Sequence, residues 1–192
     1  MDGPLRPLGQ VMNGYLVAEG EDGIVLIDQH AAHERVLYNR FLARLLARNL
    51  ASPSQALLLP EVLELSPGQV AAAADHRQRL EALGFGVEDF GPRAVRVTAV
   101  PAETPADRAP AALEELLGLL SDSRPDELTP RVAASLACHS AVRFGDRLDP
   151  SEQRRLLAEL EVAGESMTCP HGRPTRLLLS WPELKRHFRR NY

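Results

Sequence analysis

The N-terminal part of the chain alternates between apolar and polar positions with a period of two. Residues 10–19 (QVMNGYLVAE) follow this alternation, residues 20–23 (GEDG) are turn-forming types, and residues 24–28 (IVLID) are rich in β-branched side chains. Successive side chains of a β-strand point to opposite faces of a sheet, so this pattern is typical of strands with one covered face. We therefore predict a β-hairpin over residues 10–28.

The pattern changes to a helical period directly after this hairpin. From His30 onward the apolar positions Leu37, Phe41 and Leu45 recur at helical spacing, and the spacing continues to about Leu50. Apolar residues at every third or fourth position indicate an amphipathic helix. The stretch DQHAAHE therefore lies where a strand is followed by a helix.

The remaining elements follow from the same periodicities and from capping and turn residues. They are an extended segment over 56–65 that Pro60 restricts to a sheet edge or a loop, a helix that starts at Ser66 and Pro67 and ends at Gly84, strands over 85–90 and 94–100, helices over 111–120 and 129–144, a helix over 149–161 capped by Asp149 or Ser151, a strand over 175–181 and a short helix over 182–190 entered through Pro182. Strands at both ends of the chain around a helix-rich middle predict an α+β or sandwich-like α/β core with an inserted lobe.

Composition and charge restrict the classes of function. An apolar fraction of 44% and a charged fraction of 25% are typical of a globular protein. The N-terminus has no basic region before an apolar stretch, and no run approaches the ~18 apolar residues that span a bilayer, so we expect a cytoplasmic protein with no membrane partner. The net charge of −4 argues against strong autonomous binding to DNA. The basic residues at Arg40, Arg44 and Arg48 and within 185–190 are typical of a solvated helix face and a helix end.

Both cysteines are expected to be thiols, because a chain without an export signal resides where thiols stay reduced. Cys138 lies in an apolar helical stretch and is predicted to be a buried structural thiol.

Five side chains with metal-ligand chemistry lie in two short stretches. His30 and Glu34 are four residues apart, so on a helix they face the same way, and Asp28 ends the strand just before them. Cys169 and His171 are separated by one proline, whose ring restricts the backbone. A divalent cation with mixed nitrogen, oxygen and sulfur ligands would accept this set, so the sequence predicts a metal site.

Four motifs in a fixed order give the sequence a family resemblance. DQHAAHE (28–34), ACHSAVR (137–143), CPHGRP (169–174) and the terminal FRR (188–190) resemble the C-terminal domain of the endonuclease-bearing branch of the MutL family of DNA mismatch-repair proteins. The resemblance covers essentially the whole chain. It implies a discontinuous dimerisation and metal-site subdomain over 1–53 and 138–192, with an external regulatory subdomain over 54–137.

The resemblance also assigns roles to the candidate ligands. It implies that Asp28, His30 and Glu34 join Cys169 and His171 in binding zinc, as a regulatory or structural ion, and manganese or magnesium as the activating ion. Asp28, His30 and Glu34 would be the catalytic residues, and Asp28 the indispensable one.

Further residues are expected near the site. Cys138, Phe188 and Arg190 match the second and fourth motifs. The final Glu of the first motif is Asn39 here, which could still coordinate through its amide oxygen, and His139 stands where the family usually has Arg or Lys. His33 occupies a position that the family leaves free and is predicted to face solvent.

A further short match follows the first helix. Gln55, Leu58, Leu59 and Pro60, in the sequence QALLLP, resemble the peptide by which MutL-type endonucleases bind the bacterial sliding clamp. An extended segment with one polar and two apolar anchors suits such docking. The alternative is an ordinary edge strand.

The function implied is nicking of one strand of duplex DNA by a homodimeric, metal-dependent hydrolase that acts in DNA damage repair at the nucleoid. No P-loop or Rossmann motif is present, so an ATPase domain and the contact with a mismatch-sensing MutS-type protein would belong to a longer protein. A non-catalytic dimerisation module stapled by zinc is the alternative, favoured by Asn39. An unrelated metallohydrolase is a third hypothesis, and the order of the motifs counts against it.

Overall fold

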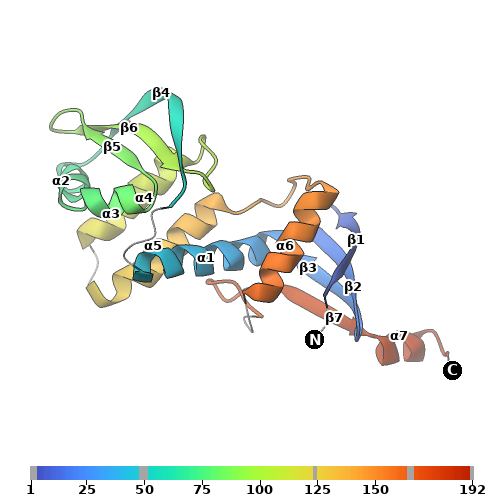
Figure 1. Cartoon of the computed structure of the whole chain (residues 1–192). Helices are drawn as coiled ribbons and strands as arrows, with labels where there is room; N and C mark the ends of the chain where they lie inside the picture. Colours follow the sequence, from blue (N-terminus) through green and yellow to red (C-terminus); the bar gives the residue numbers. More distant parts are fainter. Residues whose placement is uncertain (1–3, 48–51, 123–124, 164–166, 191–192) are drawn as a thin grey trace. The chain divides into compact units, whose positions relative to one another are not determined.

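The chain folds into two compact units. A computed structural model describes residues 4–47, 52–122, 125–163 and 167–190 (Figure 1). Unit 1 comprises Met1–Val36 and Val142–Tyr192, and unit 2 comprises Leu37–Ala141. The elements, in chain order, are β1 (Arg6–Val11), β2 (Tyr15–Gly20), β3 (Gly23–Asp28), α1 (Gln29–Ala47), β4 (Ser54–Glu64), α2 (Pro67–Asp75), α3 (Arg77–Ala82), β5 (Gly86–Asp89), β6 (Ala94–Pro101), α4 (Ala109–Asp122), α5 (Pro125–Ser140), α6 (Pro150–Val162), β7 (Arg176–Ser180) and α7 (Trp181–His187).

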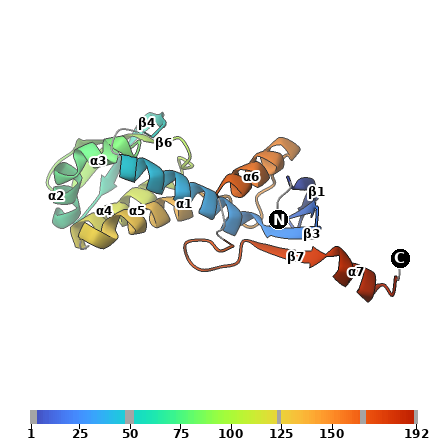
Figure 2. The ribbon, with the colours of Figure 1, turned by 60° about the horizontal axis from the view of Figure 1, so that its bottom comes forward.

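Unit 1 is built on an antiparallel sheet in the order β1-β2-β3-β7. One face of this sheet is buried beneath helical side chains, and Figure 2 shows α6 lying over it. The core of unit 1 comprises Leu16, Ala18, Val25 and Ile27 from the strands, Ala32 and Val36 from α1, and Leu148, Leu156, Leu157 and Leu160 from α6 and the segment before it. Leu178 of β7 packs against this core, so strands from both ends of the chain share it, which confirms the α+β fold class.

The predicted hairpin over residues 10–28 is in fact three strands. A tight turn at Met12 and Asn13, both with positive φ (54° and 45°), separates β1 from β2. The N–H of Gly14 closes this turn on the carbonyl of Val11 at 3.1 Å. The pair Asn13-Gly14 is a turn signal, but the prediction treated residues 10–19 as one continuous strand.

Unit 2 is built on a second antiparallel sheet, in the order β4-β6-β5, with helices α2 to α5 and the later part of α1. Its core includes Phe41 of α1, Leu80 of α3, Val97 of β6, Leu116 of α4 and Leu136 of α5. The prediction that Pro60 confines its segment to a sheet edge is confirmed, because β4 pairs only with β6 in this sheet.

Two predicted helices have different limits. The helix expected from Ser66 to Gly84 breaks at His76 into α2 and α3, and both pieces contribute to the core of unit 2 through Ala73 and Leu80. The helix expected over 129–144 ends at Ser140, because the chain leaves unit 2 at Ala141.

The borders between the units also differ from the expected residues 53/54 and 137/138. They fall after Val36 and after Ala141. The reason is packing: Leu37 and Phe41 of α1 and Ala141 after α5 all belong to the core of unit 2. The assignment of a dimerisation role and a regulatory role to the two parts stays a prediction.

Helix starts follow the local sequence closely. Ser66, Asp149 and Ser180 each cap a helix that carries Gln or Glu at the third helical position and Pro in the first turn. The capping hydrogen bonds from the Ser151 hydroxyl and from the backbone N–H groups of Glu152 and Ser151 lower the pKa of the Asp149 carboxyl. Asp149 is therefore the cap, rather than Ser151. In the described part of the chain, no helix combines the length and the apolar character needed to cross a bilayer.

Candidate metal centre

Three of the five predicted ligands converge in unit 1. Glu34 comes from the second turn of α1, and Cys169 and His171 come from the loop over residues 167–175 that leads into β7. One ligand atom from each residue lies within 4.8 Å of the other two. Nδ1 of His171 is 2.8 Å from Oε1 of Glu34. Oxygen, sulfur and nitrogen donors are thus gathered at one point, as a zinc site requires.

The backbone of the loop explains why its two ligands point to the same place. The N–H of Cys169 donates to the carbonyl of Arg173 at 2.8 Å, and the N–H of Gly172 donates to the carbonyl of Cys169 at 2.9 Å. Gly172 adopts φ +80°, which closes the tight turn after His171. The sequence CPHGRP therefore folds into a narrow loop that presents Cys169 and His171 together.

The carboxylate of Glu34 is buried without full compensation. The residue is 1% exposed, and its Oε2 has no hydrogen-bond partner. A buried charged oxygen without a partner is costly. A cation held by Glu34, Cys169 and His171 would remove this cost, so the residues present fit a bound metal.

The thiol of Cys169 is also buried, at 1% exposure. Burial raises the pKa of the Cys169 thiol above its ordinary value, and its hydrogen bond to Glu34 raises it further. The thiol therefore holds its proton at neutral pH, and a cation that binds here must displace that proton. Its affinity consequently falls as the pH falls.

Asp28 and His30 do not belong to the three-ligand group, although both lie on the β3–α1 segment that carries Glu34. Oδ1 of Asp28 accepts from the N–H of Ala31 at 2.9 Å, so Asp28 caps the start of α1. Its own N–H donates to the carbonyl of Thr175, at the end of the ligand loop, at 3.0 Å. Nδ1 of His30 lies 2.8 Å from the carbonyl of Val142, which can only accept, so Nδ1 donates, and in the neutral imidazole Nε2 is then the nitrogen with the free lone pair.

Asp28 also lines a pocket on the sheet of unit 1. The pocket has a volume of about 410 Å³, and Tyr15, Leu26, Arg176 and Leu177 contribute to its wall. The carboxylate thus caps a helix and faces a depression that a ligand could enter.

The prediction that His33 faces solvent is wrong. The side chain is half-buried, and its Nδ1 accepts from the N–H of Val142 at 3.1 Å. His30 and His33 therefore hold the two sides of a single residue, Val142, where the chain returns to unit 1.

Gln29 has a structural role that sequence reasoning missed. Its side chain is fully buried, and its amide donates to the carbonyls of Asn13, Arg143 and Asp146 at 2.8–3.0 Å. These bonds hold the start of α1 to the turn after β1 and to the segment that precedes α6. The signal in the sequence was a glutamine between two candidate ligands at the start of a helix.

The predicted buried state of Cys138 is also wrong, because Cys138 is exposed. Its position on α5 follows the fully buried Leu136 and Ala137, so its side chain leaves the face that packs on the core. Cys138 and Asn39 belong to unit 2 and the three-ligand group to unit 1, so their proximity to the metal stays a prediction. Nε2 of His139 lies 2.8 Å from a carboxylate oxygen of Glu115.

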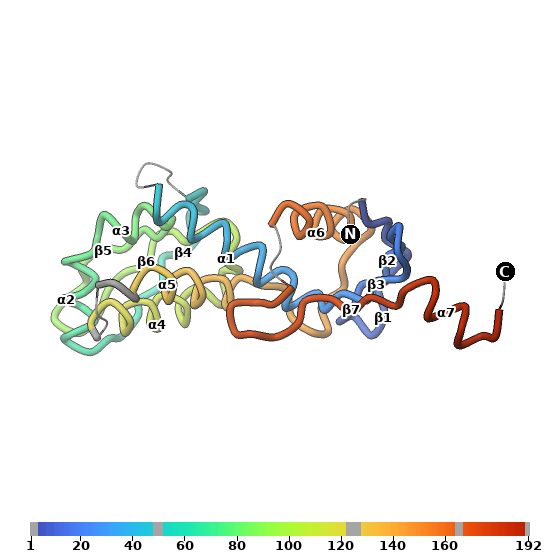
Figure 3. The backbone as a smooth tube through the Cα atoms, turned by 90° about the horizontal axis from the view of Figure 1, so that it is seen from below, coloured from blue at the N-terminus to red at the C-terminus, as the bar shows by residue number. Residues whose placement is uncertain are grey.

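Phe188 and Arg190 do not lie near the ligands of their own chain. The start of α7 is fixed by pairing of Ser180 with Gly23, at the end of β3 opposite to Asp28. Asp28 is the fifth residue after Gly23 along the strand, which corresponds to a distance of about 17 Å. Figure 3 shows α7 continuing beyond the end of β7, away from the strand start. The expected proximity to the site is therefore not met within one chain.

An apolar face of the unit 1 sheet has no covering element among the described residues. Val17, Leu26 and Leu177 are aligned across three strands, and Ile24 pairs with Leu179. Leu177 is 58% exposed and Tyr15 is 37% exposed on this face. Sequence reasoning missed this surface, although the strands IVLID and RLLLS are apolar on both faces, which is the signal of a sheet covered on both sides.

The predicted clamp-binding residues lie on β4 in unit 2. The pairing of β4 with β6 shifts between Ala56 and Glu61, so residues 57–60 bulge out of the ladder. Leu58 is fully exposed and Leu59 is 84% exposed. The amide of Gln55 donates to the carbonyl of Thr104 at 3.0 Å, so this side chain would have to leave an internal hydrogen bond to bind a partner.

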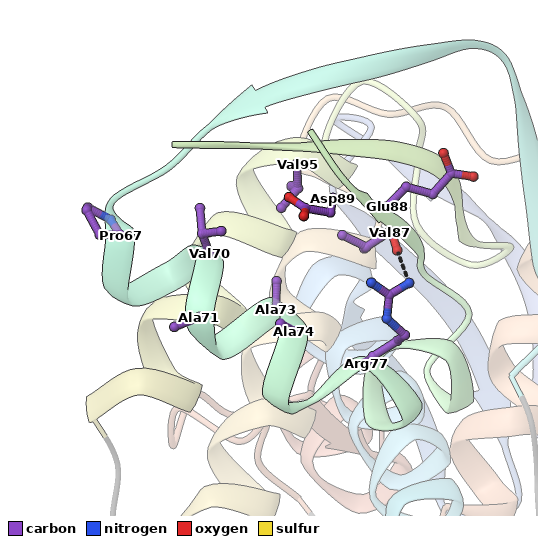
Figure 4. Close-up of a pocket in the computed structure, with 10 residues that line it drawn as sticks. All are labelled: Pro67, Val70, Ala71, Ala73, Ala74, Arg77, Val87, Glu88, Asp89 and Val95. Carbon is purple, nitrogen blue, oxygen red and sulfur yellow. Dashed lines mark hydrogen bonds between the residues drawn. The ribbon is translucent and has the colours of Figure 1, made fainter. Parts of the chain in front are cut away.

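Unit 2 also contains a pocket of about 290 Å³ between α2 and the edge strand β5 (Figure 4). Its walls include Val70, Ala73, Val87 and Val95. A guanidinium nitrogen of Arg77 donates to the carbonyl of Val87 at 3.3 Å and so covers part of the strand edge. The pocket contains no cluster of nucleophilic or metal-binding side chains and is not a candidate site.

Comparison with known proteins places this geometry in a family. A family model described as "MutL C terminal dimerisation domain" matches residues 8–148. The DNA mismatch repair protein MutL of Acidobacterium capsulatum is 38% identical over 190 residues, which cover 97% of this chain and 28% of that protein. The MutL proteins of Brucella abortus (strain S19) and Chelativorans sp. are each 39% identical over 197 residues, which cover 96% of this chain and 31% of theirs. The chain thus spans less than a third of the length of these relatives. It belongs to the family of MutL C-terminal dimerisation domains.

Proposed function

We propose that this chain is the metal-dependent endonuclease domain of a MutL-type DNA mismatch-repair protein, which nicks one strand of duplex DNA as a homodimer. The observation that carries the proposal is the buried, unpartnered Oε2 of Glu34 beside Cys169 and His171. A carboxylate oxygen is buried without a partner beside a thiol and an imidazole, which is an arrangement that suits a cation.

The residues divide into two sets by ligand chemistry. Cys169, His171 and Glu34 would hold zinc, because a thiolate is a soft ligand. The Asp28 carboxylate and Nε2 of His30 would serve manganese or magnesium, which accept harder ligands. Divalent cations so bound supply a water of lowered pKa and stabilise the leaving oxygen of a phosphodiester.

Zinc binding tests the proposed zinc ligands Cys169, His171 and Glu34. We expect the native chain to bind one zinc ion, and we expect Cys169→Ser and Glu34→Gln to lose at least about tenfold in zinc affinity. Cys138→Ser is the matched control, because it makes the same change at an exposed thiol of unit 2. Metal analysis after dialysis and competition with a chelator give both quantities. Equal zinc binding by the native chain and Cys169→Ser would refute the site.

The endonuclease itself is tested by manganese-dependent nicking of supercoiled plasmid in the presence of the loaded sliding clamp. The net charge of −4 supports weak DNA binding by the chain alone. A clamp and a mismatch-sensing MutS-type partner of the full-length protein would then bring the site to DNA.

Clamp docking would use the bulged segment of β4. We expect the double change Leu58→Ser and Leu59→Ser to reduce clamp affinity by at least about tenfold, because two exposed apolar anchors are lost. Exposed Val162 on α6 provides the control Val162→Ser. Surface plasmon resonance on immobilised clamp measures both. If the double variant binds as tightly as the native chain, the segment is only an edge strand.

The apolar face around Leu26 and Leu177 supports homodimerisation through the unit 1 sheet. A second copy of the same face is a suitable cover, because the family is one of dimerisation domains and a two-fold interface is self-complementary. Contiguous exposed apolar surface of this kind marks an interaction site.

A non-catalytic zinc-stapled module is the second candidate. It is favoured by the fact that the three converging ligands join α1 to the 167–175 loop, which is what a structural ion would do. The two candidates differ in what they require of Asp28.

A further inference from the structure

A side chain outside the predicted ligand set holds one end of the ligand loop. Arg35 follows Glu34 on α1, and its Nε–H donates to the carbonyl of Thr168 at 2.7 Å. Thr168 directly precedes Cys169. We propose that Arg35 is a positioning residue for the metal centre, which fixes Thr168 so that Cys169 and His171 meet Glu34. The inference rests on the zinc site of the proposed function.

Apart from the contacts of the ligands with Glu34, each end of the loop is hydrogen-bonded to the β3–α1 segment. Its far end is held by the hydrogen bond from the backbone N–H of Asp28 to the carbonyl of Thr175, which does not involve either side chain. Its near end is held by Arg35, and this bond depends on the type of side chain. Between these ends, the bridge of Thr168 with Pro174 and the backbone bonds within the loop fix its shape, and the contact of His171 with Glu34 joins it to α1 through the ligands themselves.

The position of Arg35 on the helix suits this role. Neighbouring residues on an α-helix point about 100° apart, so Glu34 and Arg35 leave α1 in different directions. Glu34 is buried below the loop, whereas Arg35 is only half-buried and reaches the loop from its side. One residue thus supplies the ligand, and the next holds the chain that carries the other two ligands.

Groups that orient metal ligands without binding the metal affect its affinity. Loss of such a partner typically weakens metal binding between about tenfold and a hundredfold. Without Arg35, the Thr168 carbonyl loses this hydrogen bond to α1, and the near end of the loop would pay more of its ordering entropy when the metal binds. Zinc affinity should therefore depend on the hydrogen bond rather than on the charge of Arg35.

Two substitutions separate the hydrogen bond from the charge. Gln carries an N–H donor at the same distance along the side chain as Nε of Arg, whereas Met has a methyl group there, and both are uncharged. We expect zinc to bind Arg35→Met at least about tenfold more weakly than the native chain. We expect Arg35→Gln to stay within about threefold of the native affinity, which is the range of one weak hydrogen bond. Arg155→Met, at an exposed position of α6, is the matched control and should not change zinc affinity.

The experiment measures zinc dissociation constants by chelator competition and the melting temperature of each variant with zinc and with chelator. The proposal requires that, in chelator, Arg35→Met has the same melting temperature as the native chain. It also requires that zinc raises the melting temperature of Arg35→Met by less than it raises that of the native chain. It is overturned if Arg35→Met binds zinc as the native chain does, if Arg35→Gln loses as much affinity as Arg35→Met, or if the metal-free Arg35→Met is already less stable. A native chain that binds no zinc would overturn the metal site and this inference together, whereas unchanged binding by Arg35→Met would overturn the inference alone.

Discussion

Replacement of Asp28 by Asn is expected to abolish manganese-dependent nicking while the chain still folds, dimerises and binds zinc. Asn caps a helix as well as Asp does, so the hydrogen bond from the N–H of Ala31 is retained. The converging group of Glu34, Cys169 and His171 does not include Asp28. Under the proposed function, the variant would lose a carboxylate oxygen beside the reacting phosphodiester, and loss of such a group typically lowers rates between about 10²- and 10⁴-fold.

Asp149→Asn is the matched control for this prediction. Asp149 also caps a helix, α6, but it lies on the surface and belongs to no cluster of metal ligands among the described residues. Plasmid nicking with loaded clamp, zinc content and sedimentation are measured on all three chains. If Asp28→Asn nicks as well as Asp149→Asn, Asp28 is only a helix cap. If the native chain binds zinc and dimerises but never nicks, in the isolated and in the full-length form, the zinc-stapled module is the better description.

The second large effect is expected at the apolar face of the unit 1 sheet. Leu26 lies at the centre of this face, paired with Val17 on one side and Leu177 on the other. Leu26→Glu places a carboxylate there, and in a two-fold dimer the change is made twice. An unpaired charge buried in an interface costs several kcal/mol, so we expect the dimer dissociation constant to rise at least about 10²-fold.

A second variant on the same face and a control variant in unit 2 test this prediction further. Leu177→Glu lies on the same face at a more exposed position, so it should dissociate the dimer with less risk to the fold of the monomer. Leu59→Glu makes the same change at an exposed position of β4 in unit 2 and should leave the dimer intact. Sedimentation equilibrium gives the constants, and circular dichroism checks the fold. A native-like dimer in both face variants would mean that another surface joins the copies.

The sequence by itself determined the features that depend on near neighbours. The helix starts at Ser66 and Asp149 follow from a capping side chain, a proline and a Gln or Glu within one turn. The edge position of β4 follows from Pro60, which cannot donate to a strand on that side. The pairing of Cys169 with His171 in one loop likewise needed only local spacing, because one proline separates them.

The tertiary structure decided what depends on residues far apart in the chain. It brought Glu34 together with Cys169 and His171 and left Asp28 and His30 outside that group. It also turned His33 toward Val142 and gave Arg35 a partner in Thr168. No local pattern contains these partners, because they meet only when the return of the chain at residue 142 closes the core of unit 1.

The exposure of single side chains was decided in the same way. Cys138 sits in an apolar helical stretch, yet it is exposed, because the core of unit 2 fixes which face of α5 is covered. The borders after Val36 and Ala141 follow from which core the side chains of α1 and α5 join. Periodicity shows that a helix has an apolar face, but only long-range packing selects the residues buried at its margins and the unit to which each turn belongs.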